Sequence, residues 1–361
     1  MTKSIYIYIT LLILGISFQS CADDVLGGME SMPTAFGKVN EVTVLSDQMM
    51  WDGPVGDTLD FYYTGAFPVT PTPEPLLDLR HFNHDQITHS TVFKHYRNYI
   101  ILANLGDKES KMTQMVVQDI GQEKYRQAMK DPSFNSIVGK NKWAKGQILI
   151  YLFAPTESQL MDVIKAKLPD ILQRVYAHDY EQIKANTYSA GENVIAKNAL
   201  KEIANLDAQI PSEFALAKKS LNDRMIWLRK DENQSIQSVV VRTIPYESDS
   251  QFGKEEIISL VEDFGSKHIE GDKLLVNDRD LPTYEFVKST EDRYSKELRG
   301  IWETEKSYMG GPYIAYLIKE KDSNQLIFTM SFIYAAGSPK RNLMQRMEVI
   351  MNSIKGMQET N

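Results

Sequence analysis

Cysteine is almost absent from this sequence. Among 361 residues, Cys21 is the single cysteine. That count excludes an internal disulfide, so a chain of this length must be stabilised by its hydrophobic core. Basic residues are not in excess either, since 40 Lys and Arg stand against 48 Asp and Glu and the net charge is −8. Without a block of basic residues, nucleic acid is not an expected partner.

Common catalytic motifs are also missing. The sequence has no serine in a Gly-x-Ser-x-Gly elbow, no phosphate-binding loop and no dinucleotide fingerprint. It has no internal repeat at the periods of solenoid proteins and no low-complexity tract. We therefore expect no cofactor, and a binding function is favoured over an enzymatic one.

The sequence lacks a hydrophobic run long enough to cross a bilayer. Its most apolar stretch, Ile5–Ile16, is about 12 residues long, whereas a spanning helix needs roughly 20. Lys3 precedes this run and Ser20 and Cys21 follow it, which is the order of charged, apolar and small residues in an export signal. The thiolate of Cys21 is a nucleophile that can accept a diacylglyceryl group. The pattern predicts a lipoprotein signal peptide over residues 1–20 and a lipidated Cys21 at the start of the mature chain.

Two alternatives to lipidation stay open at this point. The segment is also compatible with an ordinary cleaved signal beside a chance cysteine, or with a short membrane anchor. Phe18 departs from the leucine that bacterial lipoproteins usually carry three residues before the cysteine. Two or more acyl chains, such as palmitate, would hold the protein stably on a membrane. We expect a lipid-anchored protein of the cell envelope, in the outer membrane. The acidic residues Ala22-Asp23-Asp24 resemble surface-export tags, but they leave the periplasmic or surface face open.

The mature chain is expected to have an α+β fold in two domains. Residues 21–38 carry Gly and Pro with little periodicity and are expected to form a tether. Residues 39–155 alternate β-rich apolar runs with helical patterns, which indicates an N-terminal α/β layer domain. A helical pattern over residues 156–208, kinked or split at Pro169, predicts a helical connector. Residues 209–361 are expected to form a C-terminal α+β domain that folds alone.

The predicted C-terminal domain is an antiparallel sheet with flanking helices. Its strands are expected at 214–220, 225–230, 235–244, 294–304, 312–319 and 326–334. Apolar residues at helical spacing predict a helix at Lys254–His268 and a final helix after Pro339, whose apolar stripe is typical of a core-facing helix. By the order of its elements this half is similar to the photosystem-P-like α/β/α sandwich of several exported lipoproteins. That similarity of topology implies no function.

Several short motifs resemble one protein family. Near the C-terminus they are Arg299–Trp302, Tyr308–Tyr316, Phe332–Ala335 and Lys340-Arg341, and nearer the N-terminus they are Trp51–Gly56, Arg97-Asn98 and Trp143–Gln147. Through these motifs, essentially the whole mature chain resembles the family called domain of unknown function 4837. The resemblance implies a lipoprotein of the Bacteroidota-type diderm envelope. Because the family has no established activity, it implies no catalytic residues.

Histidines and paired carboxylates are the candidates for chemistry. Four of the six histidines lie between His81 and His95. The side chains that could supply zinc ligands are those of His81, His84, Asp85 and His89. Their spacing matches no standard metalloenzyme pattern, so we expect no metal, and solvated or core histidines instead. The carboxylate pairs that could serve acid–base hydrolysis are Asp278 with Asp280 and Glu303 with Glu305.

The strongest candidate for a binding surface is an aromatic and glycine-rich segment near the C-terminus. Its residues are Arg299, Trp302, Tyr308, Gly310, Gly311 and Tyr313. Aromatic residues with an arginine are typical of interfaces, and glycines at a strand start allow close approach of another backbone. Trp51, beside a Gly-Pro turn, is a similar candidate. The alternative for both is a tight turn with aromatic residues in the core.

The sequence thus favours a lipid-anchored envelope protein that binds a protein or glycan partner without catalysis. An envelope hydrolase that uses the paired carboxylates or the His81–His89 cluster is the alternative.

Overall fold

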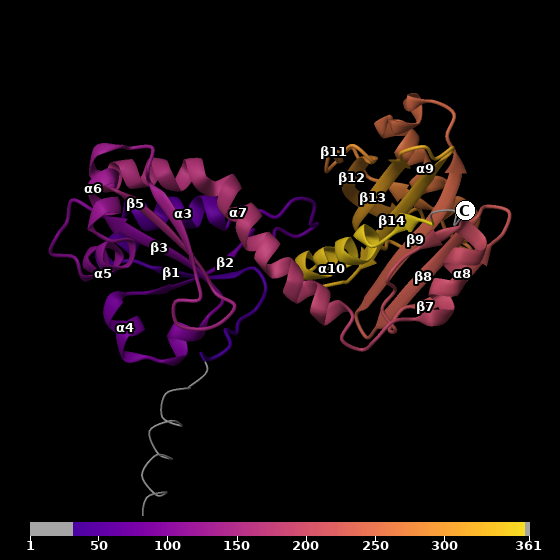
Figure 1. The fold of residues 1–361 in the computed structure, drawn as a ribbon. Coiled ribbons are helices and arrows are strands. Elements are labelled where there is room, and N and C mark those ends of the chain that lie inside the picture. The colour runs from indigo at the N-terminus through magenta and orange to yellow at the C-terminus, as the bar shows by residue number, and fades with distance from the viewer. Residues whose placement is uncertain (1–31, 358–361) are drawn as a thin grey trace, which may run out of the picture.

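The computed structural model describes residues 32–357. The predicted signal peptide, Cys21 and the acidic residues after it lie outside the described residues. Within them the chain forms two units, each built on its own sheet, and the long helix α7 (Glu157–Thr187) leads from the first unit to the second (Figure 1). The predicted α+β class is confirmed. None of the described helices is long and apolar enough to span a bilayer.

The N-terminal unit contains a five-stranded sheet. Its strands are β1 (Glu41–Leu45), β2 (Asp78–Phe82), β3 (Asn98–Asn104), β4 (Ser136–Lys140) and β5 (Ile148–Ala154). Their order in space is β2-β1-β3-β5-β4, with β4 alone antiparallel to its neighbour. Every residue of β5 and all but the last of β3 are buried, as expected for parallel strands covered on both faces.

Helices cover both faces of this sheet. One face packs against α2 (Gln48–Trp51), α3 (Pro54–Tyr63) and α7. The other packs against α4 (His84–His89), the 3-10 helix η1 (Val92–His95), α5 (Lys111–Ile120) and α6 (Gln122–Lys130). Helices α5 and α6 and strand β4 lie in a part of the N-terminal unit for which the sequence pattern predicted no helix or strand. The expected α/β layer arrangement is present.

Helix α7 runs without interruption for 31 residues. Thr156 caps it, because its hydroxyl accepts a hydrogen bond from the backbone N–H of Gln159. Pro169 was expected to kink or split this tract, but the helix continues through it. Buried apolar residues before and after the proline, Ile164 and Ile171 among them, pack on the same sheet and hold the two parts together.

The C-terminal unit contains an eight-stranded antiparallel sheet. Its strands are β7 (Ala215–Ser220), β8 (Met225–Glu232), β9 (Ser235–Pro245), β10 (Leu274–Val276), β11 (Tyr284–Ser289), β12 (Arg293–Thr304), β13 (Gly310–Glu320) and β14 (Gln325–Tyr334). The order is β10-β12-β13-β14-β9-β8-β7, and β11 pairs with β12 beside β10. The six strands that the sequence predicts are present, and β10 and β11 are additional.

Three helices make this unit a three-layer sandwich. Helix α9 (Lys254–His268) packs on one face of the sheet. Helices α8 (Val194–Ala204) and α10 (Arg341–Asn352) pack on the other. A 3-10 helix, η2 (Asp249–Phe252), precedes α9, and a two-stranded ladder joins β6 (Leu206–Asp207) to β15 (Lys355–Gly356). The expected antiparallel sheet with flanking helices is confirmed.

Two segments differ from their expected roles. The predicted connector, 156–208, consists of α7, which packs on the first sheet, and α8, whose buried face belongs to the core of the second unit. The predicted tether, 21–38, is already attached to the fold at its end: the N–H of Ala35 donates to Lys145 O at 2.8 Å and that of Phe36 to His95 O at 2.9 Å. Both differences arise from contacts between segments distant in sequence.

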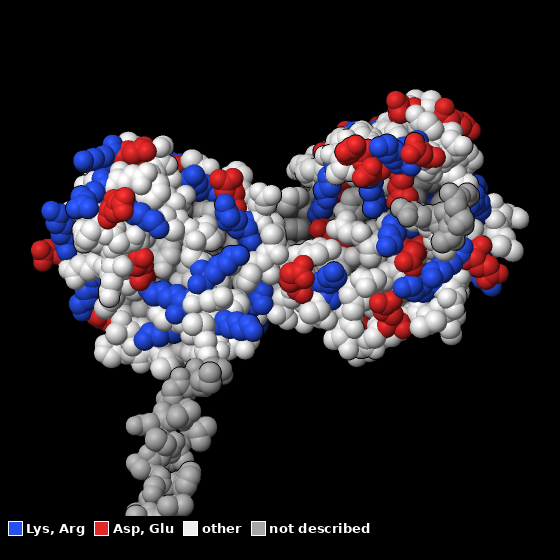
Figure 2. All heavy atoms as spheres, viewed as in Figure 1, with Lys and Arg blue, Asp and Glu red and all other residues white. Residues whose placement is uncertain are grey.

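Charges of both signs cover the surface. Figure 2 shows Lys and Arg on the visible face of the N-terminal unit, with Asp and Glu among them, and a closer mixture of both signs on the C-terminal unit. This distribution agrees with the modest net charge of −8.

Candidate functional site

A groove lies at one end of the eight-stranded sheet, beside the loop 305–309 that joins β12 to β13. It consists of two adjoining hollows, which we call the end groove. The outer hollow has a volume of about 520 Å³ and the inner hollow about 480 Å³. Both are lined by Trp302, Thr304, Met309 and Tyr334. These sizes are in the range of ligand and side-chain binding pockets.

The outer hollow is aromatic. Trp227, Phe332 and Tyr334 line it together with Trp302, and they come from β8, β14 and β12. The rings of Trp302 and Phe332 meet edge to face with centroids 5.5 Å apart, and Trp227 lies 6.3 Å from Phe332. The indole N–H of Trp302 donates to Ile333 O at 3.2 Å. Trp302 and Phe332 are only 3% and 6% exposed, so they form the buried back of the wall. The partly buried rings of Trp227 and Tyr334 supply the apolar surface that remains for another molecule.

The inner hollow lies where the two units meet. Pro71, from the proline-rich loop of the N-terminal unit, lines it opposite Gly310 and Gly311 of β13. A Cβ on Gly311 would lie 1.9 Å from Ile333 O, so only glycine allows β13 to approach β14 this closely. Neither glycine has a positive φ. Their role is close backbone approach, which is one of the two roles that the sequence suggested.

Asp272 holds the loop 305–309 in place. Its carboxylate accepts hydrogen bonds from the Ser307 hydroxyl at 2.5 Å and from the backbone N–H groups of Ser307 and Lys306 at 2.9 and 3.0 Å. These hydrogen bonds lower the pKa of Asp272 to about 2. The loop presents Tyr308 in a left-handed conformation, with φ of 54°, and the side chain is 97% exposed. The end groove thus has a fixed rim with an aromatic ring directed to solvent.

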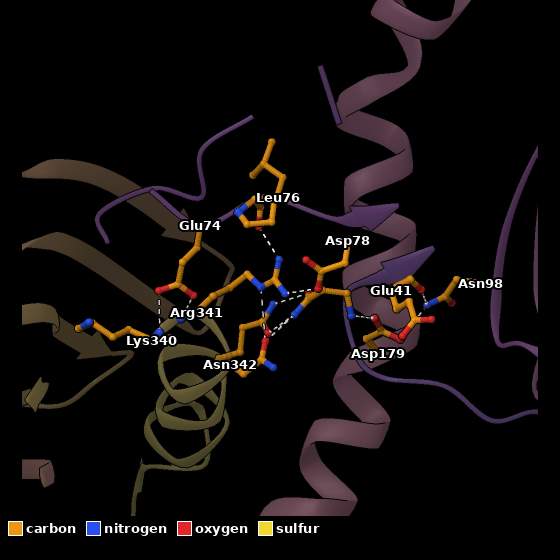
Figure 3. Close-up of polar contacts among 12 residues, drawn as sticks. Glu41, Glu74, Leu76, Asp78, Asn98, Asp179, Lys340, Arg341 and Asn342 are labelled. Carbon is orange, nitrogen blue, oxygen red and sulfur yellow. Dashed lines mark hydrogen bonds and ion pairs between the residues drawn. The ribbon is translucent and has the colours of Figure 1, made fainter. Parts of the chain in front are cut away.

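A second carboxylate fixes the opposite wall. Glu74 of the proline-rich loop accepts the backbone N–H groups of Lys340 and Arg341 at 2.6 and 2.9 Å, at the start of α10 (Figure 3). A carboxylate at a helix N-terminus meets unpaired N–H donors and the positive end of the helix dipole. In the same loop, Val69 has a φ of 65°, which is strained for a β-branched residue. The wall that carries Pro71 is therefore tied to the second unit.

A buried polar network joins the units behind this wall. Asp179 of α7 is fully buried and accepts from the backbone N–H of Asn40 at 2.6 Å, from Asn98 Nδ2 at 3.1 Å and from Arg97 at 3.2 Å. Asp179 and Asn98 are labelled in Figure 3. The side chains of Asn40 and Gln345 of α10 exchange two hydrogen bonds, of 2.8 and 2.9 Å. Because these groups satisfy one another, the two units are held in one relative position.

Arg341, the first residue of α10, makes a second set of contacts between the two units. Its guanidinium lies 2.5 Å from a carboxylate oxygen of Asp78 on β2 and donates to Pro75 O (Figure 3). The arginine side chain is buried, whereas Asp78 is half exposed. This contact fixes the end of the proline-rich loop, so the inner hollow depends on both units for its shape.

Four of the predicted binding residues belong to the end groove. They are Trp302, Tyr308, Gly310 and Gly311. The other three lie elsewhere. Arg299 is buried between Glu297 and Glu348, and these carboxylates raise its pKa although burial alone would lower it. Tyr313 is in the core with its hydroxyl 3.2 Å from that of Thr283, and Trp51 stacks on His81 in the N-terminal unit at 4.5 Å.

Several groove residues were absent from the predicted set, among them Trp227 and Pro71. Trp227 lies on β8, and Pro71 belongs to the other unit. Side chains alternate between the two faces of β8, so Trp227 lies on the same face as the buried Met225. From the sequence, this pattern indicated only core packing for Trp227. No local pattern could show that Pro71 lines the same hollow as β13, because this depends on how the two units are joined.

The predicted catalytic carboxylates are engaged as ion-pair and hydrogen-bond partners. Asp278 lies 2.8 Å from Lys254 and Asp280 lies 3.2 Å from Arg279, and these contacts lower the pKa of both acids. A general acid needs the opposite shift. Glu303 accepts from Asn277 at 3.1 Å, and Glu305 pairs with Lys273 at 3.1 Å. None of these pairs forms an acid–base dyad.

The histidines 81–89 do not converge. His81 stacks on Trp51, and burial lowers its pKa. The ring of His89 lies 2.7 Å from the backbone oxygen of Asp85, whose carboxylate pairs with Lys111. Among residues 32–357 no group of three or more His, Cys, Asp or Glu side chains is arranged to hold a metal ion.

Comparison with known proteins gives two family matches. Residues 193–353 match Domain of unknown function (DUF4837), and residues 35–188 match Domain of unknown function (DUF8532). The first family is therefore the one that the sequence motifs suggested, but its match is confined to the C-terminal unit. The motifs around Trp51, Arg97 and Trp143 fall in the second family.

Solved structures show only distant likeness. The Ran-binding protein Mog1p of Saccharomyces cerevisiae is 10% identical, with a TM-score of 0.28 over 42% of this chain and 89% of that one. A protein of Bacteroides thetaiotaomicron VPI-5482 is 9% identical, with a TM-score of 0.25 over 44% of this chain and 47% of that one. Scores this low support no argument about function. No curated protein matches the chain significantly. The chain is thus similar to the DUF4837 family over its C-terminal unit and to the DUF8532 family over its N-terminal unit.

Proposed function

We propose that this protein is a non-enzymatic, lipid-anchored module of the bacterial cell envelope that binds a protein or glycan partner in the end groove. The observation that carries the proposal is the groove itself. It combines an aromatic wall, a fixed rim with a fully exposed tyrosine, and a second wall supplied by the other unit. Apolar hollows with aromatic anchors are typical of interaction sites.

The chemistry of the groove supports binding over hydrolysis. Asp272, which holds the loop, accepts several hydrogen bonds and has a pKa of about 2, so it is not a proton donor at neutral pH. Lys306 and Arg229 are at the edge of the outer hollow and do not form a pair with it. No observation favours the hydrolase.

The envelope location rests on the N-terminal sequence. Lys3, the apolar run and Cys21 have the order of a lipoprotein signal, and the described fold is attached from about Ala35 onward. A lipidated Cys21 would leave about a dozen residues as a tether between the acyl chains and the fold. Outer-membrane placement and the choice between the periplasmic and surface faces belong to the same proposal.

Lipidation can be tested by labelling. Cys21→Ser removes the thiol that would form the thioether, so the variant should take up no labelled palmitate and should leave the membrane fraction. A Ser20→Ala variant, which keeps a small residue before Cys21, is the control and should be labelled like the native chain. Undiminished acyl labelling of Cys21→Ser would reject the lipoprotein assignment.

The end groove can be tested by site-specific crosslinking in intact envelopes. A photoreactive amino acid in place of Tyr308 should give a discrete adduct, because this side chain is 97% exposed beside the groove. Met49, 89% exposed on the N-terminal unit, is the matched control position and should give none. Met309→Lys, added to the variant with the photoreactive residue at position 308, puts a charge between the two hollows. The yield of adduct should then fall at least ten-fold.

The form of the adduct separates the two partner classes. After digestion of the adduct, peptides of a second polypeptide joined to the probe peptide identify a protein partner. An added mass on the probe peptide that glycosidases remove identifies a glycan. Equal adducts from the probes at Tyr308 and Met49, or an adduct unaffected by Met309→Lys, would show that the groove is not the binding site.

A further inference from the structure

Strand β11 forms an exposed edge of the eight-stranded sheet. All six of its residues, Tyr284–Ser289, are exposed. One side of the strand pairs with β12 over its whole length, and within residues 32–357 no strand pairs with its other side. Its unpaired N–H and C=O groups are therefore a template for another strand.

The side chains of this edge are unusually apolar for a solvent-facing strand. Tyr284, Phe286 and Val287 are 50%, 41% and 55% exposed, and Leu281 just before the strand is 43% exposed. Aromatic and β-branched residues also have a high preference for strands. The edge thus offers both backbone hydrogen bonds and apolar surface to a second strand.

The opposite edge of the same sheet is different. Strand β7 has a register irregularity between Leu216 and Lys218, and Lys218 and Lys219 follow each other on it. Bulges and lysines are the devices by which proteins prevent edge-to-edge pairing. β11 has a regular register along all six residues. One edge is therefore protected, and the other is open.

The charges of β11 are already balanced within the sheet. Glu285 lies 2.7 Å from Lys296, and Lys288 lies 3.3 Å from Glu297. The edge therefore has no excess of one sign that would repel a strand of the same composition. A highly charged peptide would gain little here.

We propose that β11 pairs antiparallel with β11 of a second copy of this chain and joins two eight-stranded sheets into one. The two copies are related by a two-fold axis perpendicular to the sheet. Such an axis does not exchange the two faces of the sheet, so the side chains of directly opposed residues point to the same face. For a six-residue strand the axis then lies at Phe286 or at Val287. This surface is separate from the end groove and does not depend on its function.

Charge complementarity favours a second copy in both registers. With the axis at Phe286, Lys288 opposes Tyr284 of the second copy, and with the axis at Val287 it opposes Phe286. Both arrangements place a cation against an aromatic ring. In neither register does Glu285 oppose Glu285 or Lys288 oppose Lys288, so no like charges face each other directly. The pairing buries the exposed aromatic and valine side chains of both copies.

The single cysteine of the sequence allows a direct test. The chain from Ala22 onward contains every described residue and no cysteine. In that background, Phe286→Cys or Val287→Cys should give a disulfide-linked dimer under mild oxidation, since residues at the axis face their own copies within reach of a disulfide. Val138→Cys, on the edge strand β4 of the other sheet, and Lys218→Cys on β7 are matched controls and should remain monomeric.

Oligomeric state gives an independent readout. Analytical ultracentrifugation should show that the unsubstituted chain forms dimers. Val287→Lys should raise the dissociation constant of the dimer at least ten-fold, because it places two lysines at or near the two-fold axis. Val138→Lys, also an exposed valine on an edge strand, should leave it unchanged. The proposal would be overturned if the chain were monomeric at all concentrations and formed no disulfide dimers. It would also be overturned by a dimer that Val287→Lys does not weaken, or by a different polypeptide bound along β11.

Discussion

Asp179→Ala is expected to lower the free energy of unfolding by about 3–5 kcal/mol. The carboxylate is fully buried and accepts hydrogen bonds from Asn40, Asn98 and Arg97. Removing it leaves the Arg97 guanidinium beside the buried network without its anion, and removing one partner of a buried charge pair is among the most destabilising substitutions. Urea-induced unfolding, followed by far-UV circular dichroism, measures the change.

Two further variants identify the cause. Asp170→Asn alters an exposed carboxylate on the same helix and is expected to change stability by less than about 0.5 kcal/mol. Asp179→Asn keeps one acceptor oxygen, so its loss of unfolding free energy should lie between those of Asp170→Asn and Asp179→Ala. If Asp179→Ala unfolded at the same urea concentration as Asp170→Asn, the network would not be stabilising the fold.

The same network connects stability to the candidate site. Asp179 holds Asn40, and Asn40 exchanges hydrogen bonds with Gln345 of α10, whose first residues are fixed by Glu74 of the proline-rich loop. That loop supplies Pro71 to the inner hollow. A substitution in the network therefore has two effects: it destabilises the chain, and it releases one wall of the end groove. The outer hollow, which lies wholly within the C-terminal unit, should keep its shape.

Local pattern was enough to predict much of the fold. The spacing of Ile257, Val261 and Phe264 identified α9 at its observed bounds, Lys254–His268. Helix α6 was not identified, because it buries only Ala128 and consists mainly of polar residues. The continuity of α7 through Pro169 could not be predicted either. It depends on packing against a sheet that the local sequence does not describe.

The candidate site was predictable only in part. Trp302, Tyr308 and Tyr313 stand out by residue type, but residue type did not show that Tyr308 is 97% exposed whereas Trp302 and Tyr313 are buried in the core. Arg299 resembled an interface arginine, yet Glu348 of α10, 49 residues later, engages it in a partly buried ion pair. Partners this far apart in sequence leave no spacing pattern. The remaining part of the site required the three-dimensional contacts.

The division of the chain gives the last prediction. Residues 209–361 were expected to fold alone, but the structure places α8 in the core of the C-terminal unit. The buried residues that this boundary would remove are Ala196, Ala199, Leu200, Ile203, Ala204, Leu206 and Ala208. The three large ones alone contribute on the order of 5–9 kcal/mol of burial, at about 1.5–3 kcal/mol each. That is comparable to the net stability of a whole domain.

We therefore expect a fragment that starts at Asn193 to fold and one that starts at Gln209 to remain unfolded, when both end at Asn361. The longer fragment keeps every buried member of the two cores of this unit except Phe67, which comes from the N-terminal unit. Its amide spectrum should be dispersed, with a cooperative urea transition, whereas the shorter fragment should show neither. A matched control ends the longer fragment at Gly337. It lacks α10, which contributes Met344, Met347 and Ile350 to the core, and should not fold. Cooperative folding of the fragment that starts at Gln209 would show that α8 packs on a core that is complete without it.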